Sequence, residues 1–141
     1  MAKGADSMNG DRKRTYVFDS NSERKVATYL HELNIFWRPQ PHVLIIDSYG
    51  KERIVHPDLF LPDFGIYVEV CGSEKKEYYE KKKKMYSNNH IPIIFVETYK
   101  GEKKWKGYIV IKLREIQIQR QELLSRVAEI QGYKQEILAA S

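Results

Sequence analysis

The stretch Val55 to Gly72, VHPDLFLPDFGIYVEVCG, holds the side chains whose types and spacing are best suited to chemistry. Two Pro-Asp pairs supply Asp58 and Asp63, and an otherwise apolar run supplies Glu69, which is followed two residues later by Cys71. Carboxylate oxygens are ligands that divalent cations such as Ca²⁺ and Mg²⁺ bind in proteins. The pattern therefore directs attention to a candidate site for a divalent cation.

Strand pairing is expected to bring two of these carboxylates together. The PDFG tetrapeptide predicts a hairpin turn centred between Asp63 and Phe64, and this register places Asp58 opposite Glu69. Directly paired side chains have Cβ atoms about 4.5 to 5.5 Å apart, so facing like charges are destabilising unless a cation lies between them. By the two-residue period of a strand, Cys71 faces the same side as Glu69. The alternate residues of this strand then face the core: Ile66, Val68 and Val70.

A structural role without chemistry is the alternative for both carboxylates. In that interpretation Asp58 is a solvated residue of a turn or a strand edge, and Glu69 is a solvated, exposed strand residue. Asp63 is expected to be structural in either case, because Asp is favoured in turns, where its side chain bonds to the backbone.

The elements that must position these residues follow an α/β order. Apolar residues at steps of three and four in SNSERKVATYLHELNIFW predict an amphipathic helix from Ser20. The β-rich runs are separated by the turn signals DSYGKE and LPDFG, which predicts a three-stranded antiparallel meander. These runs are Val43–Ile46, Arg53–Phe60 and Ile66–Val70.

A second helix and a buried strand are expected to complete the core. The segment SEKKEYYEKKKKMYSNNH is rich in helix formers and ends at Ser-Asn-Asn, where helices commonly stop. The run IPIIFVET is almost entirely apolar, as in a strand buried on both faces, and we expect it to be the central strand. A helical crossover from the third strand would make the two strands parallel.

The last third of the chain predicts a long helix. The segment KGYIVIKLREI fits either a further strand or the start of that helix. Beyond it, one apolar seam recurs every seven residues and consists of Ile116, Leu123, Ile130 and Ile137. A second seam has Leu113 and Val127, but Arg120 and Lys134 occupy its alternate places. We therefore expect three regions: a disordered basic extension over 1–14, a core domain over 15–111, and a C-terminal helix over 112–141 that packs or oligomerises. A homodimer or a partner protein bound through this helix is a hypothesis.

Composition limits the partners. The chain has 24 Lys and Arg against 19 Asp and Glu, with the excess concentrated in EKKEYYEKKKK and KGEKKWKGY. A polyanion such as DNA is one interpretation, and solvated helix faces are the other. No window approaches the run of about 18 apolar residues expected of a membrane span. A single cysteine and an N-terminus without an apolar signal region predict an intracellular protein, either cytoplasmic or nucleoid-associated.

The combined pattern resembles the PD-(D/E)XK nuclease superfamily over Phe18 to Glu97. A first helix with Glu23 is followed by Pro57-Asp58 on one strand and by Glu69-Val70-Cys71 at the end of the next, and then by Gly72, a helix and a buried strand. The resemblance implies a restriction endonuclease-like fold, which is an α/β fold with a mixed β-sheet flanked by helices. It also implies cleavage of DNA phosphodiester bonds with Mg²⁺, for which Mn²⁺ can substitute.

The same resemblance assigns roles to individual residues. Asp58, Glu69 and the backbone carbonyl of Val70 would hold the metal ion. Glu23 would reach a second metal ion or a bound water, although Ser20-x-x-Glu23 is also a capping box, in which Glu23 satisfies a backbone N–H. Gln40 follows the first helix, where some members of the superfamily place a supporting polar residue.

The sequence departs from the family at Cys71, which stands where the motif has a lysine. A thiol cannot supply the fixed positive charge that stabilises the phosphate. Lys82 is the predicted replacement, because it shares a helix face with Tyr78 and Tyr86 and some members carry the lysine on this helix. Cys71 would then be a small buried residue. Other lysines are expected to bind DNA phosphates: Lys75, Lys76, Lys81, Lys83, Lys84, Lys103 and Lys104.

Three functional hypotheses follow from these observations. The first is a metal-dependent endodeoxyribonuclease with Asp58, Glu69, Lys82 and Glu23 as its catalytic residues. The second is a catalytically inactive nuclease fold kept for DNA binding or assembly, which the loss of the motif lysine favours. The third is a protein-interaction domain that uses the C-terminal helix. His56 is expected to be a residue of a strand edge, not an acid or base.

Overall fold

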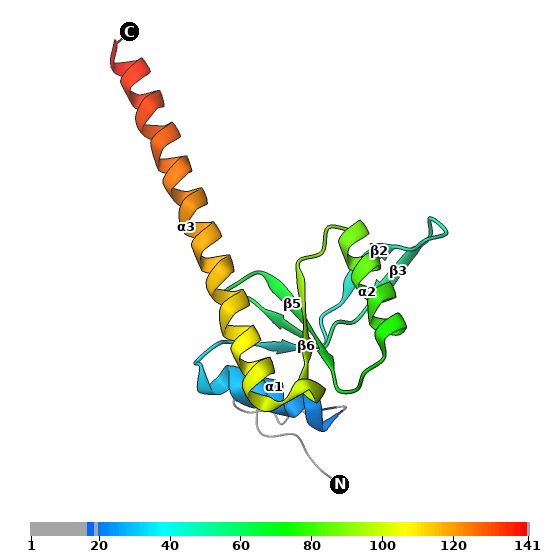
Figure 1. The fold of residues 1–141 in the computed structure, drawn as a ribbon. Helices are drawn as coiled ribbons and strands as arrows, with labels where there is room; N and C mark the ends of the chain where they lie inside the picture. The colour runs from blue at the N-terminus through cyan, green and yellow to red at the C-terminus, as the bar shows by residue number, and fades with distance from the viewer. Residues whose placement is uncertain (1–16, 19, 141) are drawn as a thin grey trace.

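The computed structural model describes residues 17–18 and 20–140 (Figure 1). The predicted extension over 1–14 lies outside this range. The elements are α1 (Asn21–Glu32), β1 (Arg38–Pro39), β2 (Val43–Ile46), β3 (Glu52–Val55), β4 (Leu59–Leu61), β5 (Ile66–Cys71), α2 (Lys76–Asn88), β6 (Ile93–Glu97), a short 3₁₀ turn (Thr98–Lys100) and α3 (Glu102–Ala140). The predicted α/β class and the long C-terminal helix are confirmed.

The main sheet has the strand order β1-β4-β5-β6. β4 pairs antiparallel with β1 and β5, and β6 pairs parallel with β5. The parallel pair is joined through α2, as predicted. The prediction that the IPIIFVET strand is central is wrong, because β6 lies at the edge of the sheet and β5 lies inside it. The segment after β6 forms a helix instead of adding another strand to that edge.

The predicted three-stranded meander is also wrong. The run Arg53–Phe60 is divided into β3 and β4 by His56, Pro57 and Asp58. β3 pairs with β2 in a separate two-stranded sheet, whereas β4 joins the main sheet. Pro57 has no backbone N–H and a fixed φ, so it cannot extend a regular ladder through this point.

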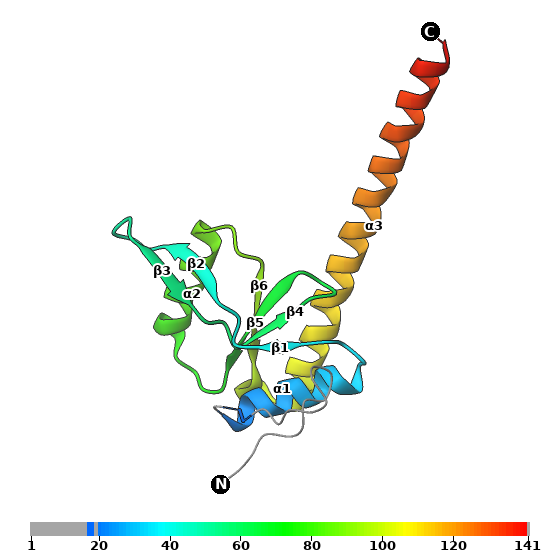
Figure 2. The ribbon, with the colours of Figure 1, turned by 180° about the vertical axis from the view of Figure 1, so that it is seen from behind.

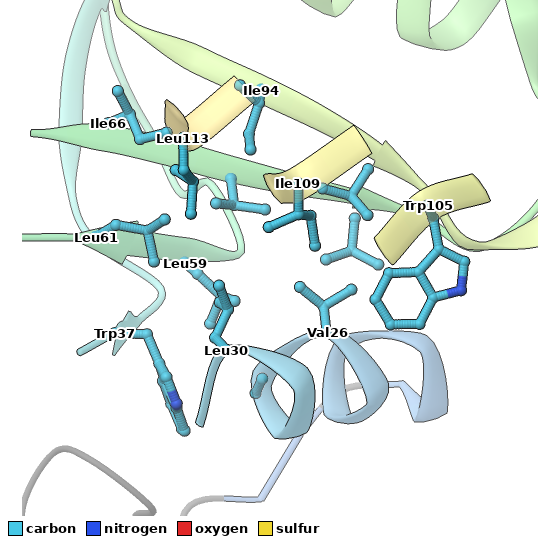
Figure 3. Packing of buried hydrophobic residues seen from close by; sticks show 14 of the residues in the cluster. Val26, Leu30, Trp37, Leu59, Leu61, Ile66, Ile94, Trp105, Ile109 and Leu113 are labelled. Atoms are coloured by element: carbon cyan, nitrogen blue, oxygen red, sulfur yellow. The ribbon is translucent and has the colours of Figure 1, made fainter. Parts of the chain in front are cut away.

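Helices cover both faces of the main sheet. On one face, residues of α1 and α3 pack against alternate residues of β5 and β6 in the principal core (Figure 3). On the other face, Tyr86 of α2 packs against Cys71 and Phe95. The sequence predicted that alternate residues of β5 face opposite sides of the sheet. This is confirmed, because Val68 lies in the principal core and Cys71 packs with Tyr86 on the face that α2 covers. Glu69 therefore lies on the face that α2 covers.

The β2–β3 hairpin is attached at the end of α2. Its turn is closed by Asp47, whose Oδ1 accepts hydrogen bonds from the N–H groups of Tyr49 and Lys51 at 2.9 and 3.0 Å. Asn89, the C-cap of α2, binds Ile46 twice: its Oδ1 accepts from the backbone N–H at 2.7 Å and its Nδ2 donates to the carbonyl at 3.0 Å. These contacts position the hairpin beside α2, as both ribbon views show (Figures 1 and 2).

The helix α3 begins at Glu102, which resolves the ambiguous segment KGYIVIKLREI as helix. The boundary between 111 and 112 that the sequence suggested falls inside this continuous helix. Its first turns bury Trp105, Ile109 and Leu113 in the principal core, and its second half extends away from the body (Figure 2). None of the described helices is both long and apolar enough to cross a membrane.

Candidate active site

Asp58 and Glu69 approach each other across the β4–β5 pair. The pairs Leu59 with Val68, Phe60 with Tyr67 and Leu61 with Ile66 confirm the predicted register, and its continuation by one residue places Asp58 opposite Glu69.

The backbone on both sides holds Asp58 in place. Its Oδ2 accepts a hydrogen bond from the N–H of Val70 at 2.6 Å, and its carbonyl accepts one from the N–H of Gln40 at 2.9 Å. Asp58 therefore bridges β1 and β5 at the point where the chain enters β4. The predicted supporting residue Gln40 contributes through its backbone, at φ 41°, and its side chain is exposed.

Glu69 has a buried carboxylate, and one of its two oxygens forms an ion pair. Its exposed fraction is 4%. Its Oε2 lies 2.5 Å from the Nζ of Lys82, whereas its Oε1 has no hydrogen-bond partner among the described residues. A buried polar atom without a partner costs stability, and functional sites commonly account for such atoms. This oxygen is therefore available to bind a ligand.

Lys82 reaches this carboxylate from α2. Tyr78, one helical turn earlier, lies below the ammonium group, with its ring centroid 4.8 Å from Nζ. Burial lowers the pKa of Lys82, but the hydrogen bonds to Glu69 and Tyr78 outweigh it and raise the pKa above its ordinary value. Lys82 is thus a fixed positive charge beside the carboxylates, as the relocation hypothesis requires.

The pKa of Asp58 is raised, because the positive charge of Lys82 does not compensate for burial and for the neighbouring carboxylates. Burial, followed by the negative charge of Glu69, raises the pKa of Asp58 to about 7, although the Val70 N–H and Lys82 act in the opposite direction. Glu23 also contributes to the increase. A divalent cation at this place would favour the ionised carboxylate and remove the conflict between the acidic groups.

The donor set fits a magnesium ion. The described residues contain no cluster of three or more His, Cys, Asp or Glu side chains suited to a metal ion. Mg²⁺, however, commonly keeps several waters and uses one or two carboxylates together with substrate phosphates. Asp58, with Oδ1 not used by the Val70 N–H, and Glu69, with Oε1 unpartnered, supply two such carboxylates. Val70, the third predicted ligand, adjoins both through β5 and its bond to Asp58.

Glu23 combines a capping role with proximity to the site. The Ser20 Oγ accepts from the Glu23 N–H and donates to Glu23 Oε2, both at 3.1 Å. Ser20 therefore caps α1 as the sequence suggested, whereas among the described residues the Glu23 carboxylate binds the Ser20 hydroxyl and not the backbone N–H that a capping box predicts. The first turn of α1 also lies against the end of β5, because a Cβ atom on Gly72 would come within 2.8 Å of Ser22 Oγ. Glu23, which is buried in the same turn, is near enough to Asp58 for its negative charge to contribute to the raised pKa of Asp58.

Cys71 is a core residue on the α2 face. It is 1% exposed and packs with Tyr86 and Phe95. Burial, together with the negative charges of Glu69 and Glu97, raises the pKa of the thiol to about 12. The thiol is therefore neutral at physiological pH, and its location agrees with the role of a small buried residue.

The seven predicted DNA-binding lysines are all exposed. Lys75 is the N-cap of α2, four others lie on α2, and Lys103 and Lys104 lie in the first turn of α3. Lys83 and Lys104 contribute to two neighbouring hollows along β6, with volumes of about 540 and 180 Å³, which share Phe95, Glu97 and Tyr108. The structure thus gathers some of these lysines at the edge of the sheet.

Sequence analysis missed two basic positions near this region. Lys100 follows β6 and pairs with Glu97 at 3.0 Å. Arg24 contributes to a third hollow of about 500 Å³ between α1 and α3, and its buried Nε has no hydrogen-bond partner among the described residues. Arg24 directly follows Glu23, and this adjacency to a candidate site residue was the available signal.

Two further residues have structural positions. His56 is exposed and its ring lies 4.5 Å from that of His42, centroid to centroid, which agrees with the expectation of an edge residue. Asp63 lies in the β4–β5 turn, where its carbonyl accepts a hydrogen bond from Arg120 of α3. The turn is completed by Gly65 at φ 65°, a conformation that favours glycine.

Comparisons with known proteins returned no match among protein-family models, curated proteins or solved structures.

Proposed function

We propose that this protein is a Mg²⁺-dependent endodeoxyribonuclease with a restriction endonuclease-like fold. The observation that carries the proposal is the buried Glu69, which faces Asp58 across paired strands, binds Lys82 through one oxygen and leaves the other without a partner. A binding module gains nothing from two facing carboxylates near a phosphate. A nuclease requires them for its metal ion.

Each residue has a defined task in this proposal. Asp58, Glu69 and the Val70 carbonyl would hold Mg²⁺, and the metal ion would supply polarisation of the phosphate and a bound water of lowered pKa. Mn²⁺ can take the same ligands. Lys82 stabilises charge that develops on the phosphate, which is the role of the absent motif lysine. Glu23 orients a water or a second metal ion from α1.

The exposed lysines of α2 and of the first turn of α3 are proposed to contact the DNA backbone. Each phosphate contact releases condensed counterions, so the affinity for duplex DNA should fall steeply with salt. Such contacts position the duplex and carry no sequence information.

The test is cleavage of supercoiled plasmid in Mg²⁺ or Mn²⁺ by wild-type protein and by Glu69→Gln. Glu52→Gln is the matched control, because Glu52 is an exposed carboxylate on β3. The proposal predicts cleavage that EDTA abolishes, that Glu69→Gln loses and that Glu52→Gln retains. Cleavage that survives in Glu69→Gln would refute the assignment of the site.

A second pair of variants tests the lysine. Lys82→Ala is expected to lose most of the activity, and addition of Cys71→Lys in the same chain is expected to restore part of it by returning a cation to the motif position. Full activity in Lys82→Ala would show that another cation acts.

An inactive nuclease fold retained for DNA binding is the second candidate, and the neutral buried Cys71 at the motif lysine position favours it. The same experiment separates the two. The inactive fold predicts salt-sensitive binding of DNA without cleavage by the wild type, and cleavage gained in Cys71→Lys.

A further inference from the structure

The second half of α3 carries an exposed apolar stripe. The helix leaves the body after its first turns and extends alone in both ribbon views (Figures 1 and 2). Three apolar side chains along this part, spaced four and three residues apart, are 42 to 66% exposed: Leu123, Val127 and Ile130. Solvated helices rarely keep such a regular stripe in water, so the spacing points to a partner helix.

This stripe continues the face by which α3 binds its own body. Trp105, Ile109 and Leu113 are buried, and Ile116 packs against the same core. Steps of four and three residues keep later positions on the same side of a helix. Any partner that covers the exposed stripe therefore lies on the same side of α3 as the body.

Two cations lie within the stripe and restrict the partner's orientation. Arg120 and Lys134 occupy the seam of Leu113 and Val127, at intervals of seven residues. In a parallel pair of identical helices, residues of this seam meet their own copies, so each cation would face itself. The body would also occupy the path of the partner's first turns, because it packs on the same face. A parallel pair is therefore disfavoured by charge and by space.

We propose that two copies of the chain associate through an antiparallel pair of α3 helices. In this arrangement the first seam of one helix faces the second seam of the other. Val127 then lies beside Ile130 of the second copy, and Leu123 lies beside the aliphatic stem of Lys134, whose ammonium group extends to solvent. The two bodies lie at opposite ends of the pair.

The charge of the segment is compatible with self-association. Residues 114–140 contain four basic and four acidic residues, so two copies carry no net repulsion. The acidic residues recur every seven positions, outside both apolar seams: Glu115, Glu122, Glu129 and Glu136. Because these acidic residues lie outside the seams, the charges within the stripe are those of Arg120 and Lys134.

Disulfide formation between engineered cysteines tests the orientation. The native Cys71 is 1% exposed, so it does not compete. In the antiparallel pair, Leu123→Cys of one copy meets Lys134→Cys of the other, whereas two copies of either variant place their thiols about 16 Å apart along the axis. A disulfide requires Cα atoms within about 7 Å. The mixture should therefore cross-link on oxidation, and neither variant alone should. Cross-linking of each variant alone would overturn the proposal in favour of a parallel pair.

Sedimentation of the full chain at several concentrations tests association itself. Val127→Asp should raise the dimer dissociation constant by at least about tenfold, because it buries a charge in the pair. Ile118→Asp is the matched control, since Ile118 is 52% exposed and lies outside both seams of the same helix. A wild-type protein that stays monomeric at every concentration, or equal weakening by both variants, would refute the proposal. Neither result bears on the nuclease site, because neither Val127 nor Ile118 is among the residues that form it.

Discussion

Replacement of Asp58 by Asn should remove a pH-dependent loss of stability from the metal-free protein. Burial and the charge of Glu69 raise the pKa of Asp58 to about 7, against an ordinary value of 3.8. A carboxyl group with a raised pKa binds its proton more tightly in the folded state. Its favourable contribution is present below about pH 4 and is lost as the pH rises to about 7.

The magnitude follows from the two pKa values. One pKa unit corresponds to about 1.4 kcal/mol, so the largest contribution is about 4 kcal/mol, and partial exposure to solvent reduces it to about 2 kcal/mol. Asn keeps an oxygen that can accept the hydrogen bond now made by the Val70 N–H at 2.6 Å, but it does not titrate. The free energy of unfolding of wild type, minus that of Asp58→Asn, should therefore fall by about 2 kcal/mol between pH 4 and pH 8.

Urea unfolding in EDTA at several pH values measures this difference. Because the variant and wild type share all other titrating groups, subtraction isolates Asp58. A parallel experiment at pH 8 with Mg²⁺ at about 100 times its dissociation constant should stabilise wild type by about 2.7 kcal/mol and leave Asp58→Asn unchanged. Parallel pH profiles for the two proteins would refute the electrostatic reasoning.

Three further predictions concern the surroundings of the site. Iodoacetamide at pH 8 should modify Cys71 more than about 100-fold slower in the folded than in the urea-unfolded protein, because its pKa is raised to about 12 and it is 1% exposed; equal rates would contradict its burial. Ile109→Ala should cost about 2 to 5 kcal/mol in urea unfolding, whereas Ile111→Ala on the same helix, at 59% exposed, should cost less than about 1 kcal/mol; a similar loss in both would show that α3 does not dock as described. Ser20→Ala should destabilise the protein by about 1 kcal/mol through loss of the α1 cap, and an unchanged midpoint would contradict the capping contacts.

The sequence predicted the local geometry of the site better than the arrangement of the strands around it. The turn residues fixed the β4–β5 register, and the two-residue period placed Glu69 and Cys71 on one face. The strand order depended on contacts distant in sequence, which periodicity does not report. Pro57 indicated a break in the strand, but the sequence did not show that β4 would join a different sheet from β3. That separation depends on the pairing of β4 with β1.

The contact between Lys82 and Glu69 was predictable only in part. Helical spacing placed Lys82 on one face with Tyr78 and Tyr86, and Tyr86 is indeed the buried residue that orients that face. The choice of Lys82 from a run of four lysines depended on which face packs against β5. The unpartnered oxygen of Glu69 depends on burial from every side, and no pattern in the sequence reports it.

Cleavage of supercoiled plasmid by wild type and Glu69→Gln, side by side in Mg²⁺ and in EDTA, tests most directly whether this site is a nuclease centre. We predict nicked and linear products for wild type in Mg²⁺ alone, with none for Glu69→Gln in either condition. Equal cleavage by both proteins, or cleavage that persists in EDTA, would contradict a metal-dependent reaction at Asp58 and Glu69.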